Sequence, residues 1–382
     1  MQLGIEKRMV PHIPWGLVAI ALLISTLGLY NLASASRPPS SVWTTQALYL
    51  GVGVLAALVV SLFDLRFIYR ITPWVYGANI LALVALRFMG HTAKGAESWF
   101  VLGPFRLQPA EFMKVGILMM LARYFHESYR PNDDTYGLRR LLAPGAIIAV
   151  PTVLVLLQPD LGGALMIALS GATVILFARP KRWMVVTLGL VMAAGSAVLW
   201  NDYVRDHGDP SHYLVRHHLK KHQSNRISGW LDPETDLRGS NYHAAQSRIA
   251  VGSGGLWGKG WRNGTQTMLS FLPEQHTDFI FSVWAEEHGF FACLLLLVLY
   301  GAALVLTLGV ASDSKDRFGA FFAVGCAALI FWQVFENIGM IVGVLPVTGI
   351  TLPLMSYGGS SLVSMMLTIG LLVNISMRRH MF

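Results

Sequence analysis

The chain has 382 residues, and 54% of them are hydrophobic whereas only 13% are charged. A soluble globular protein of this length does not need so apolar a composition, so the balance excludes that class and favours a polytopic membrane protein. The formal net charge of +8 suits contact with anionic membrane lipid, and no segment is typical of a nucleic-acid-binding module. We therefore expect residues 1–382 to form a single membrane domain with no nucleic acid as a partner.

Ten apolar segments are long enough, or nearly long enough, to cross a bilayer. Because backbone polar groups cannot be left bare in lipid, we expect each segment to be a helix and the fold class to be all-α. In chain order the segments are Trp15–Leu32, Ala47–Phe63, Trp74–Leu86, Phe112–Phe125, Leu141–Leu157, Leu161–Ala178, Met184–Trp200, Phe290–Leu308, Phe318–Val342 and Leu362–Met377.

The Lys and Arg residues of the short loops gather on one side of these segments, and such an excess marks the cytoplasmic side. That side carries Lys7, Arg8, Arg66, Arg70, Arg123, Arg130, Arg139, Arg140, Arg179, Lys181, Arg182, Lys315, Arg317, Arg378 and Arg379. The short loops of the other side carry only Arg37, Arg87, Lys94 and Arg106. We therefore expect cytoplasmic termini and a large extracytoplasmic loop, residues 201–278, between the seventh and eighth segments.

Three regions break the pattern of apolar segments and polar loops. Residues 91–109 are too apolar for a solvated loop, so we expect them to dip into the protein or lie at the membrane interface. Within the long loop, Gln246–Val251 has the character of a short helix, and a glycine-rich run follows from Gly252 to Trp261. The prolines and glycines of Gly343–Ser361 are typical of a structured re-entrant turn.

Asp278 is the most informative single residue, because it lies among the last polar residues before the apolar run Phe290–Leu308. A carboxylate where an aqueous loop meets the membrane is well placed to act on the polar head of a lipid-linked substrate. Desolvation at that edge can raise its pKa toward neutrality, as a general base requires. The alternative is that Asp278 caps the N-terminus of the following helix, and spacing alone does not decide between the two.

A second group of charged residues suggests an anion site. Glu111 and Lys114 are spaced i, i+3 at the start of the fourth segment and can pair on one helix face. The pair is either a structural link between helices, or it makes Lys114 a pyrophosphate contact whose charge Glu111 tunes. Arg106 would reinforce such a site, because its guanidinium fork matches phosphate oxygens, and Lys259 in the glycine-rich run could also face an anion.

Asp160 lies in a tight turn, Gln158-Pro-Asp-Leu-Gly162, between the fifth and sixth segments. An aspartate immediately before a helix satisfies the first backbone amides, so Asp160 is a candidate cap. The alternative is that Asp160 lines the same outward cavity as the charged residues above.

Five sequence blocks occur in order along almost the whole chain. They are GAESWFVLGPFRLQPAEFMK (Gly95–Lys114), QPDLGGAL (Gln158–Leu165), SRIAVGSGGLWGKGWRNGTQ (Ser247–Gln266), FLPEQHTDFIFSVWAEEHGF (Phe271–Phe290) and NIGMIVGVLPVTGITLPLMSYGGSS (Asn337–Ser361). Together they resemble the SEDS family, the RodA/FtsW glycosyltransferases. The sequences GKGWRNGTQ and FLPEQHTDF are closer to RodA than to FtsW.

The resemblance implies a peptidoglycan glycosyltransferase of the bacterial plasma membrane that polymerises lipid II during cell elongation. It also implies a class B penicillin-binding protein as the transpeptidase partner. The family's essential aspartate maps onto Asp278, which would act as general base in an inverting displacement of undecaprenyl pyrophosphate. Arg106, Lys114 and Lys259 would stabilise the departing anion, together with a divalent cation such as Mg or Mn. The expected substrate-binding residues are Arg106, Glu111, Lys114, Asp160, Lys259, Gln266 and His276.

Two other functions are compatible with some of these features. A flippase that moves lipid II across the membrane would also use intramembrane charges such as Glu111, Lys114 and Glu336. A flippase needs groups that face both sides, however, whereas the key acid is expected on the external face. A non-catalytic scaffold for the penicillin-binding protein would not need Asp278 at all.

Overall fold

The computed structural model describes residues 10–36, 41–89, 91–93, 96–102, 105–130, 135–205, 230, 242–269 and 275–378. Helices occupy all ten predicted segments. They are α1 (Trp15–Ala35), α2 (Val42–Leu62), α3 (Leu65–Met89), α4 (Pro109–Glu127), α5 (Leu138–Leu157), α6 (Leu161–Phe177), α7 (Arg182–Arg205), α12 (Ile280–Asp313), α13 (Arg317–Val342) and α14 (Gly359–Met377). Among the described residues seven of these helices are long and apolar enough to cross a membrane, and α6 and Arg182–Val198 are shorter apolar helices.

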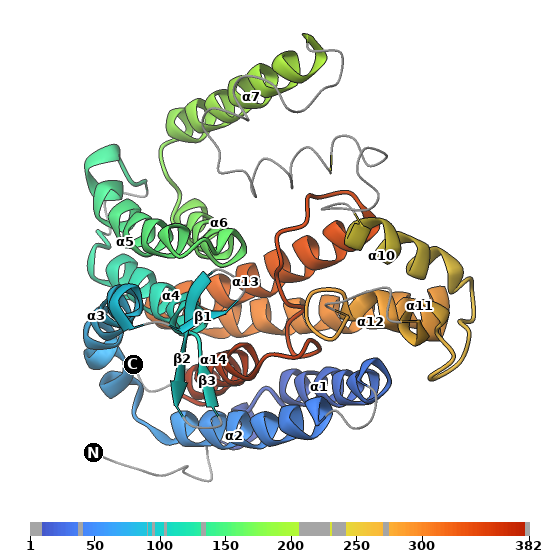
Figure 1. Ribbon diagram of the computed structural model, residues 1–382. Coiled ribbons are helices and arrows are strands. Elements are labelled where there is room, and N and C mark those ends of the chain that lie inside the picture. Colours follow the sequence, from blue (N-terminus) through green and yellow to red (C-terminus); the bar gives the residue numbers. More distant parts are fainter. Residues whose placement is uncertain are drawn as a thin grey trace.

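Helix α13 is the centre of the bundle. It packs against α12 on one side and against α4 and α6 on another, while α14 packs against α2 (Figure 1). Phe318, Phe322 and Leu329 in its first half belong to an apolar core that also contains residues of α4 and α6. Val334 and Met340 in its second half belong to another core, which contains residues of α1, α12 and α14. A helix that is apolar on every face is stable only when it is surrounded in this way.

Helix α7 has few of these contacts. It stands apart from the packed helices at the top of Figure 1, and its apolar side chains, among them Val186, Leu190 and Met192, are exposed. The prediction that the seventh apolar segment is a helix is thus confirmed. This helix does not pack into the bundle as the others do.

The sequence prediction missed a small sheet. Strands β1 (His91–Ala93), β2 (Ala96–Leu102) and β3 (Phe105–Leu107) form an antiparallel sheet in the order β1-β2-β3. Its Val, Phe and Trp residues favour a pleated, half-buried surface, which explains why this loop is so apolar. Arg106 on β3 pairs with Val101 of β2 and lies three residues before α4 begins. The chain is therefore all-α in its membrane segments but not throughout.

The long loop is helical where the prediction placed a helix. Helix α10 (Tyr242–Ser253) contains the predicted Gln246–Val251, and a short helix, α11 (Thr265–Met268), follows the glycine-rich run. Much of the rest of the loop, residues 206–229 and 231–241, lies outside the described residues.

Helix α12 begins ten residues before the predicted apolar run and is broken at Gly289, where φ is 75° and ψ is −172°. Its 34 residues would span about 51 Å if straight, well beyond the ~30 Å of a bilayer core. The first part, Ile280–His288, is instead covered by the glycine-rich run, with Lys259 N donating to Glu286 O at 3.1 Å and Gly260 N donating to Glu287 O at 2.9 Å. The break separates a membrane segment from a segment packed against the long loop.

We expect Gly289→Ala to lower the melting temperature clearly, because that combination of φ and ψ is essentially restricted to glycine and costs other residues about 1–3 kcal/mol. A Cβ at this position would also collide with the backbone nitrogen of Gly258. Gly309→Ala is the matched control, since it lies in the same helix and its Cβ would meet nothing within 4 Å. Equal melting temperatures for the two variants would show that the break is not required.

Candidate active site

The connection between α13 and α14, Gly343–Gly358, is non-helical and firmly held, as predicted for a structured turn. Asn337 on α13 donates its amide to Ile350 O at 2.6 Å. Gln46 on α2 donates to Ser356 O at 3.0 Å and accepts from Gly358 N at 3.2 Å. Because a buried backbone needs partners for its polar groups, these side chains allow an irregular segment to lie inside the bundle.

Asp278 lies directly against this connection. Asn337 donates to its backbone carbonyl at 2.9 Å as well as to Ile350, so one side chain fixes both segments. A Cβ at Gly349, where φ is +80°, would lie 3.3 Å from Asp278 Oδ2. The N-cap position of α12 is occupied by Phe279, so Asp278 lies one residue before it. The alternative that the Asp278 side chain caps this helix stays a prediction, and its partly buried carboxylate faces the connection.

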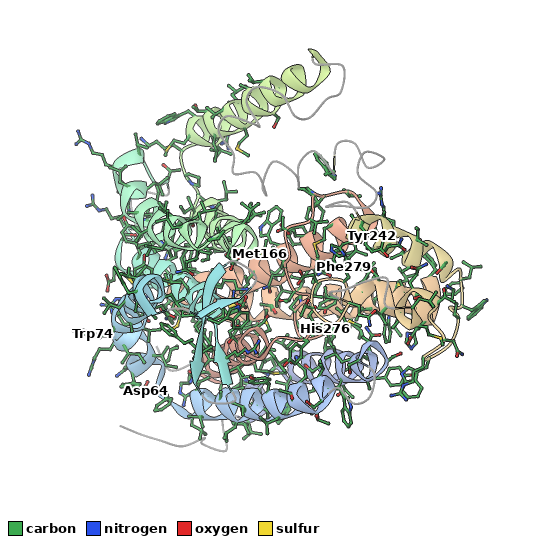
Figure 2. All side chains as sticks on the ribbon, in the orientation of Figure 1. Asp64, Trp74, Met166, Tyr242, His276 and Phe279 are labelled. Atoms are coloured by element: carbon green, nitrogen blue, oxygen red, sulfur yellow. The ribbon has the colours of Figure 1, made fainter. Side chains whose placement is uncertain are left out.

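His276 and Arg106 approach the same connection from two other elements. The backbone carbonyl of His276 accepts from Tyr357 N at 2.9 Å, and the two rings are 5.9 Å apart. The Arg106 carbonyl accepts from Ser360 Oγ at 3.0 Å. Burial raises the pKa of Tyr357, Tyr49 adds to that rise, and the nearby Arg106 guanidinium opposes it. Figure 2 shows His276 and Phe279, on either side of Asp278 in the sequence, within the body of the bundle.

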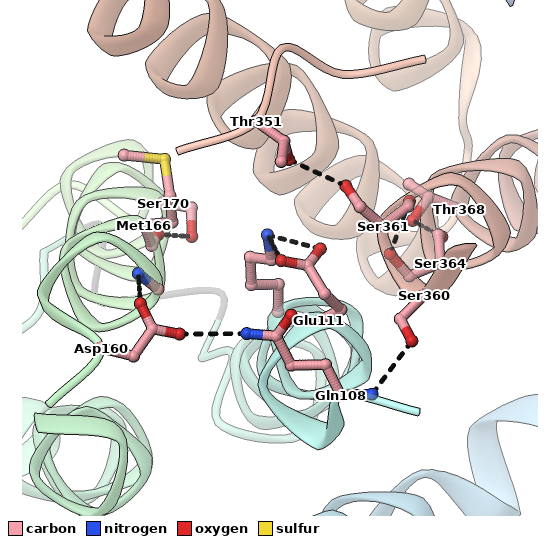
Figure 3. Close-up of polar contacts among 12 residues, drawn as sticks. Gln108, Glu111, Asp160, Met166, Ser170, Thr351, Ser360, Ser361, Ser364 and Thr368 are labelled. Carbon is pink, nitrogen blue, oxygen red and sulfur yellow. Dashed lines mark hydrogen bonds and ion pairs between the residues drawn. The ribbon is translucent and has the colours of Figure 1, made fainter. Parts of the chain in front are cut away.

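The predicted pair on α4 is confirmed. Lys114 Nζ lies 2.7 Å from each carboxylate oxygen of Glu111, and the two side chains are only 4% and 12% exposed. A charge this well buried is retained only with a close partner. Lys114 and Glu111 are therefore held together as an ion pair at the start of α4. Figure 3 shows this pair beside the connection between α13 and α14.

Asp160 both caps α6 and faces this pair. Its Oδ1 accepts from Gly163 N at 2.7 Å, which confirms the cap, and its Oδ2 accepts from Gln108 Nε2 at 3.2 Å (Figure 3). Burial raises the pKa of Asp160, the Gly163 amide opposes the rise, the Glu111 carboxylate adds to it and the Lys114 ammonium opposes it. Asp160 is thus the predicted cap and also a neighbour of the Glu111–Lys114 pair, whereas the outward cavity that it would line stays a prediction.

These residues form one polar cluster, which we define as Arg106, Glu111, Lys114, Asp160, His276 and Asp278. Gly162, at the start of α6, lies against the connection between α13 and α14. A Cβ at Gly162 would be 2.7 Å from Ile350 Cγ1 and 3.1 Å from Thr348 O. The start of α6 therefore packs directly on the connection that Asp278 also touches.

Lys259 and Gln266 gather around a different carboxylate, Glu286, which is fully buried on α12. Lys259 Nζ donates to Glu286 Oε1 at 2.8 Å, to Ser253 at 2.7 Å and to Thr265 at 2.8 Å. Gln266 contributes its backbone amide, 3.0 Å from Glu286 Oε1. An ammonium has three donors, and all three are used here.

Sequence reasoning missed Glu286 and Ser360. The signal for Glu286 was present, because a charged residue in a run of buried apolar residues must have a partner. Ser360 accepts from Gln108 N and donates to Arg106 O, both at 3.0 Å, across more than 250 residues of sequence. No local pattern could have revealed that contact.

The described residues include no group of three or more His, Cys, Asp or Glu side chains that could hold a metal ion. Within this described part of the chain, the side chains alone therefore do not form a metal site.

The fold and the cluster define a polytopic, multi-pass membrane protein with a charged site at one end of its helix bundle. The chain belongs to the FtsW/RodA/SpoVE family of cell cycle proteins, whose sequence model matches residues 10–381. The resemblance of the five sequence blocks is thereby confirmed.

Relatives from several bacteria are similar over nearly the whole chain. Peptidoglycan glycosyltransferase MrdB of Escherichia coli K12 is 38% identical over 367 residues, which cover 96% of this chain and 93% of the relative. Stage V sporulation protein E of Bacillus subtilis is 33% identical over 383 residues, which cover 94% of this chain and 96% of the relative.

Solved structures agree with this assignment. The rod shape determining protein RodA of Thermus thermophilus matches with a TM-score of 0.69 and 30% identity, covering 96% of this chain and 97% of that one. Another match is a chain from a solved structure of a peptidoglycan synthase complex that coordinates polymerization and crosslinking. Its TM-score is 0.79 and its sequence identity is 32%. That match covers 96% of this chain and 98% of the other.

Proposed function

We propose that this chain is a peptidoglycan glycosyltransferase that polymerises lipid II into β-1,4-linked glycan strands during cell elongation. The observation that carries the proposal is the polar cluster, which combines one partly buried carboxylate, Asp278, with the cations Arg106 and Lys114 around a single connection. The relative from Escherichia coli is named a peptidoglycan glycosyltransferase, which supports the same activity here.

In the proposed reaction Asp278 takes the proton from the 4-hydroxyl of the acceptor GlcNAc as that oxygen attacks the anomeric carbon of the donor MurNAc. The bond from that carbon to the pyrophosphate oxygen breaks, and undecaprenyl pyrophosphate leaves with the electron pair. Since an α-linked donor becomes a β-1,4 bond, a single inverting displacement is sufficient. No covalent glycosyl-enzyme is required.

The departing pyrophosphate gains negative charge that fixed cations can stabilise. Lys114, held by Glu111, and Arg106 are the cations of the cluster, and we assign the pyrophosphate contact to them. Asp160 would act mainly by holding Gln108 and the start of α6, and His276 by holding Tyr357 beside Arg106. Substrate contacts of Lys259 and Gln266 stay a prediction, and their bonds to Glu286 favour a structural role.

The location and partner follow from the same proposal. We place the protein in the bacterial plasma membrane with both termini in the cytoplasm and the cluster on the extracytoplasmic side, where residues 201–278 form the large external loop. The similarity to a chain from a peptidoglycan synthase complex supports a transpeptidase partner, and we propose a class B penicillin-binding protein. Two lipid tails must lie side by side, so the cluster must open laterally to the membrane.

The deciding experiment supplies labelled lipid II to the purified protein, alone and with a class B penicillin-binding protein, and separates the products by gel electrophoresis. Glycan polymer is the expected result. In parallel, vesicles carrying the protein are given the same lipid II to follow its movement between leaflets. Movement of lipid II without polymer would mean that the protein is a flippase rather than a glycosyltransferase. If neither polymer nor movement is seen, the non-catalytic scaffold is the remaining function.

A divalent cation is a separate part of the proposal, because pyrophosphate oxygens can bind Mg or Mn as they leave. We expect a chelator to lower the polymerisation rate and added Mg or Mn to restore it, while the melting temperature of the protein stays unchanged. Full activity in chelator would show that Arg106 and Lys114 suffice.

A further inference from the structure

A charged pocket lies at the opposite end of the bundle from the polar cluster. Its volume is about 360 Å³, and it lies where α3 and α13 begin and α4 ends. Since α4 begins at the cluster and ends at this pocket, the two are separated by the length of that helix. The pocket is lined by Leu65, Arg66, Tyr69, Arg70, Arg123, His126, Asp316 and Phe318.

Three arginines supply its positive charge. Arg66 and Arg70 are spaced i, i+4 on α3 and so lie on one face of that helix. Arg123 on α4 is fixed in place, with Nε donating to Glu127 at 2.9 Å, Nη1 donating to the Tyr69 carbonyl at 3.0 Å, and the guanidinium 4.7 Å from the centre of the Tyr69 ring. Its Nη2 makes no hydrogen bond to the described residues, nor does the Arg70 side chain.

The acidic groups at the pocket already have partners. Asp316 accepts from Gly319 N at 3.3 Å as the cap of α13 and lies 2.9 Å from His126 Nδ1. Glu127 accepts from Arg123 and from the Tyr69 hydroxyl, the latter at 2.8 Å. Asp64 accepts from the backbone of Arg66 at 3.0 Å. The guanidinium donors that no carboxylate of the described residues occupies are thus those of Arg70 and Arg123 Nη2.

We propose that this pocket binds the phosphate headgroup of an anionic membrane phospholipid. Guanidinium groups bind phosphate oxygens in a two-pronged geometry, and three arginines from two helices converge here. Leu65 and Phe318 add apolar walls that suit the glycerol and the first acyl carbons rather than a free, fully hydrated phosphate. Basic pockets between the ends of membrane helices are a recurrent site for such headgroups.

The test measures the melting temperature of the full chain in neutral detergent while short-chain dihexanoyl phosphatidylglycerol is titrated in. We expect stabilisation by this lipid and none by dihexanoyl phosphatidylcholine, whose headgroup has no net charge. Arg70→Gln should weaken the apparent affinity about fivefold, the effect of roughly one arginine near an anionic lipid, and the double variant Arg66→Gln, Arg70→Gln should weaken it further. The matched control is Arg139→Gln, an exposed arginine of α5 outside the pocket.

Two results would overturn the proposal. Equal affinities for the lipid in Arg70→Gln and Arg139→Gln would mean that the pocket does not bind it. Stabilisation by inorganic phosphate as strong as that by phosphatidylglycerol would mean that the ligand is the free anion. The melting temperatures without lipid show whether each variant is folded, and the measurement does not depend on catalytic activity.

Discussion

Replacing Asp278 with asparagine is expected to lower the rate of glycan polymerisation about 10²–10⁴-fold, the usual contribution of a general base. Asparagine keeps the size of the side chain and can still hydrogen-bond, but it cannot accept the proton of the acceptor hydroxyl. The backbone bond from Asn337 to the carbonyl of residue 278 is unchanged by the substitution, so the segment stays in place. The measurement is the initial rate of polymer formation from labelled lipid II, with lipid II binding measured in the same samples.

Asp313→Asn is the matched control, because Asp313 is an exposed aspartate at the far end of α12, the helix that begins two residues after Asp278. It should polymerise at the wild-type rate. If Asp278→Asn also does so while binding lipid II normally, Asp278 is not the base. The search would then turn to Glu111 and Asp160, the other carboxylates of the cluster.

Replacing Lys259 with methionine is expected to destabilise the protein by about 3 kcal/mol, near the lower end of the range for breaking a buried ion pair. The variant leaves the fully buried Glu286 carboxylate without its cation, although Thr265 and the Gln266 amide still donate to it at 3.1 and 3.0 Å. The measurement is the free energy of unfolding, or the melting temperature, in a single detergent.

Adding Glu286→Gln to Lys259→Met should recover much of the loss, because the uncompensated charge is then removed while the side chain keeps its size. Lys315→Met, at an exposed lysine, should have little effect. A double variant no more stable than Lys259→Met alone would mean that lost packing of the lysine stem, rather than unpaired charge, causes the effect.

The sequence was sufficient for features that depend on neighbours along the chain. The helices followed from apolar length, because lipid leaves the backbone no other partner. The Glu111–Lys114 pair and the Asp160 cap followed from spacing within one turn of a helix. Asp278 was identified as important, but only the structure shows that Phe279, rather than Asp278, occupies the N-cap position of α12.

What could not be predicted depends on contacts between distant segments. The apolar loop before α4 forms a sheet because the strands pair with one another, whereas its composition was equally compatible with a membrane-interface segment. Lys259 pairs with Glu286 because the glycines of the run let its backbone approach α12, and spacing carries no sign of that approach. For the same reason the start of α12 and the break at Gly289 were missed.

The position of α13 has a consequence for how the molecule comes apart. Because its first half lies in one apolar core and its second half in the other, neither core can lose its packing without exposing a face of the same helix. The helix thus links the end that carries the polar cluster to the end that carries the arginine pocket in one cooperative unit. We therefore expect the two ends to lose their packing together on heating, rather than one after the other.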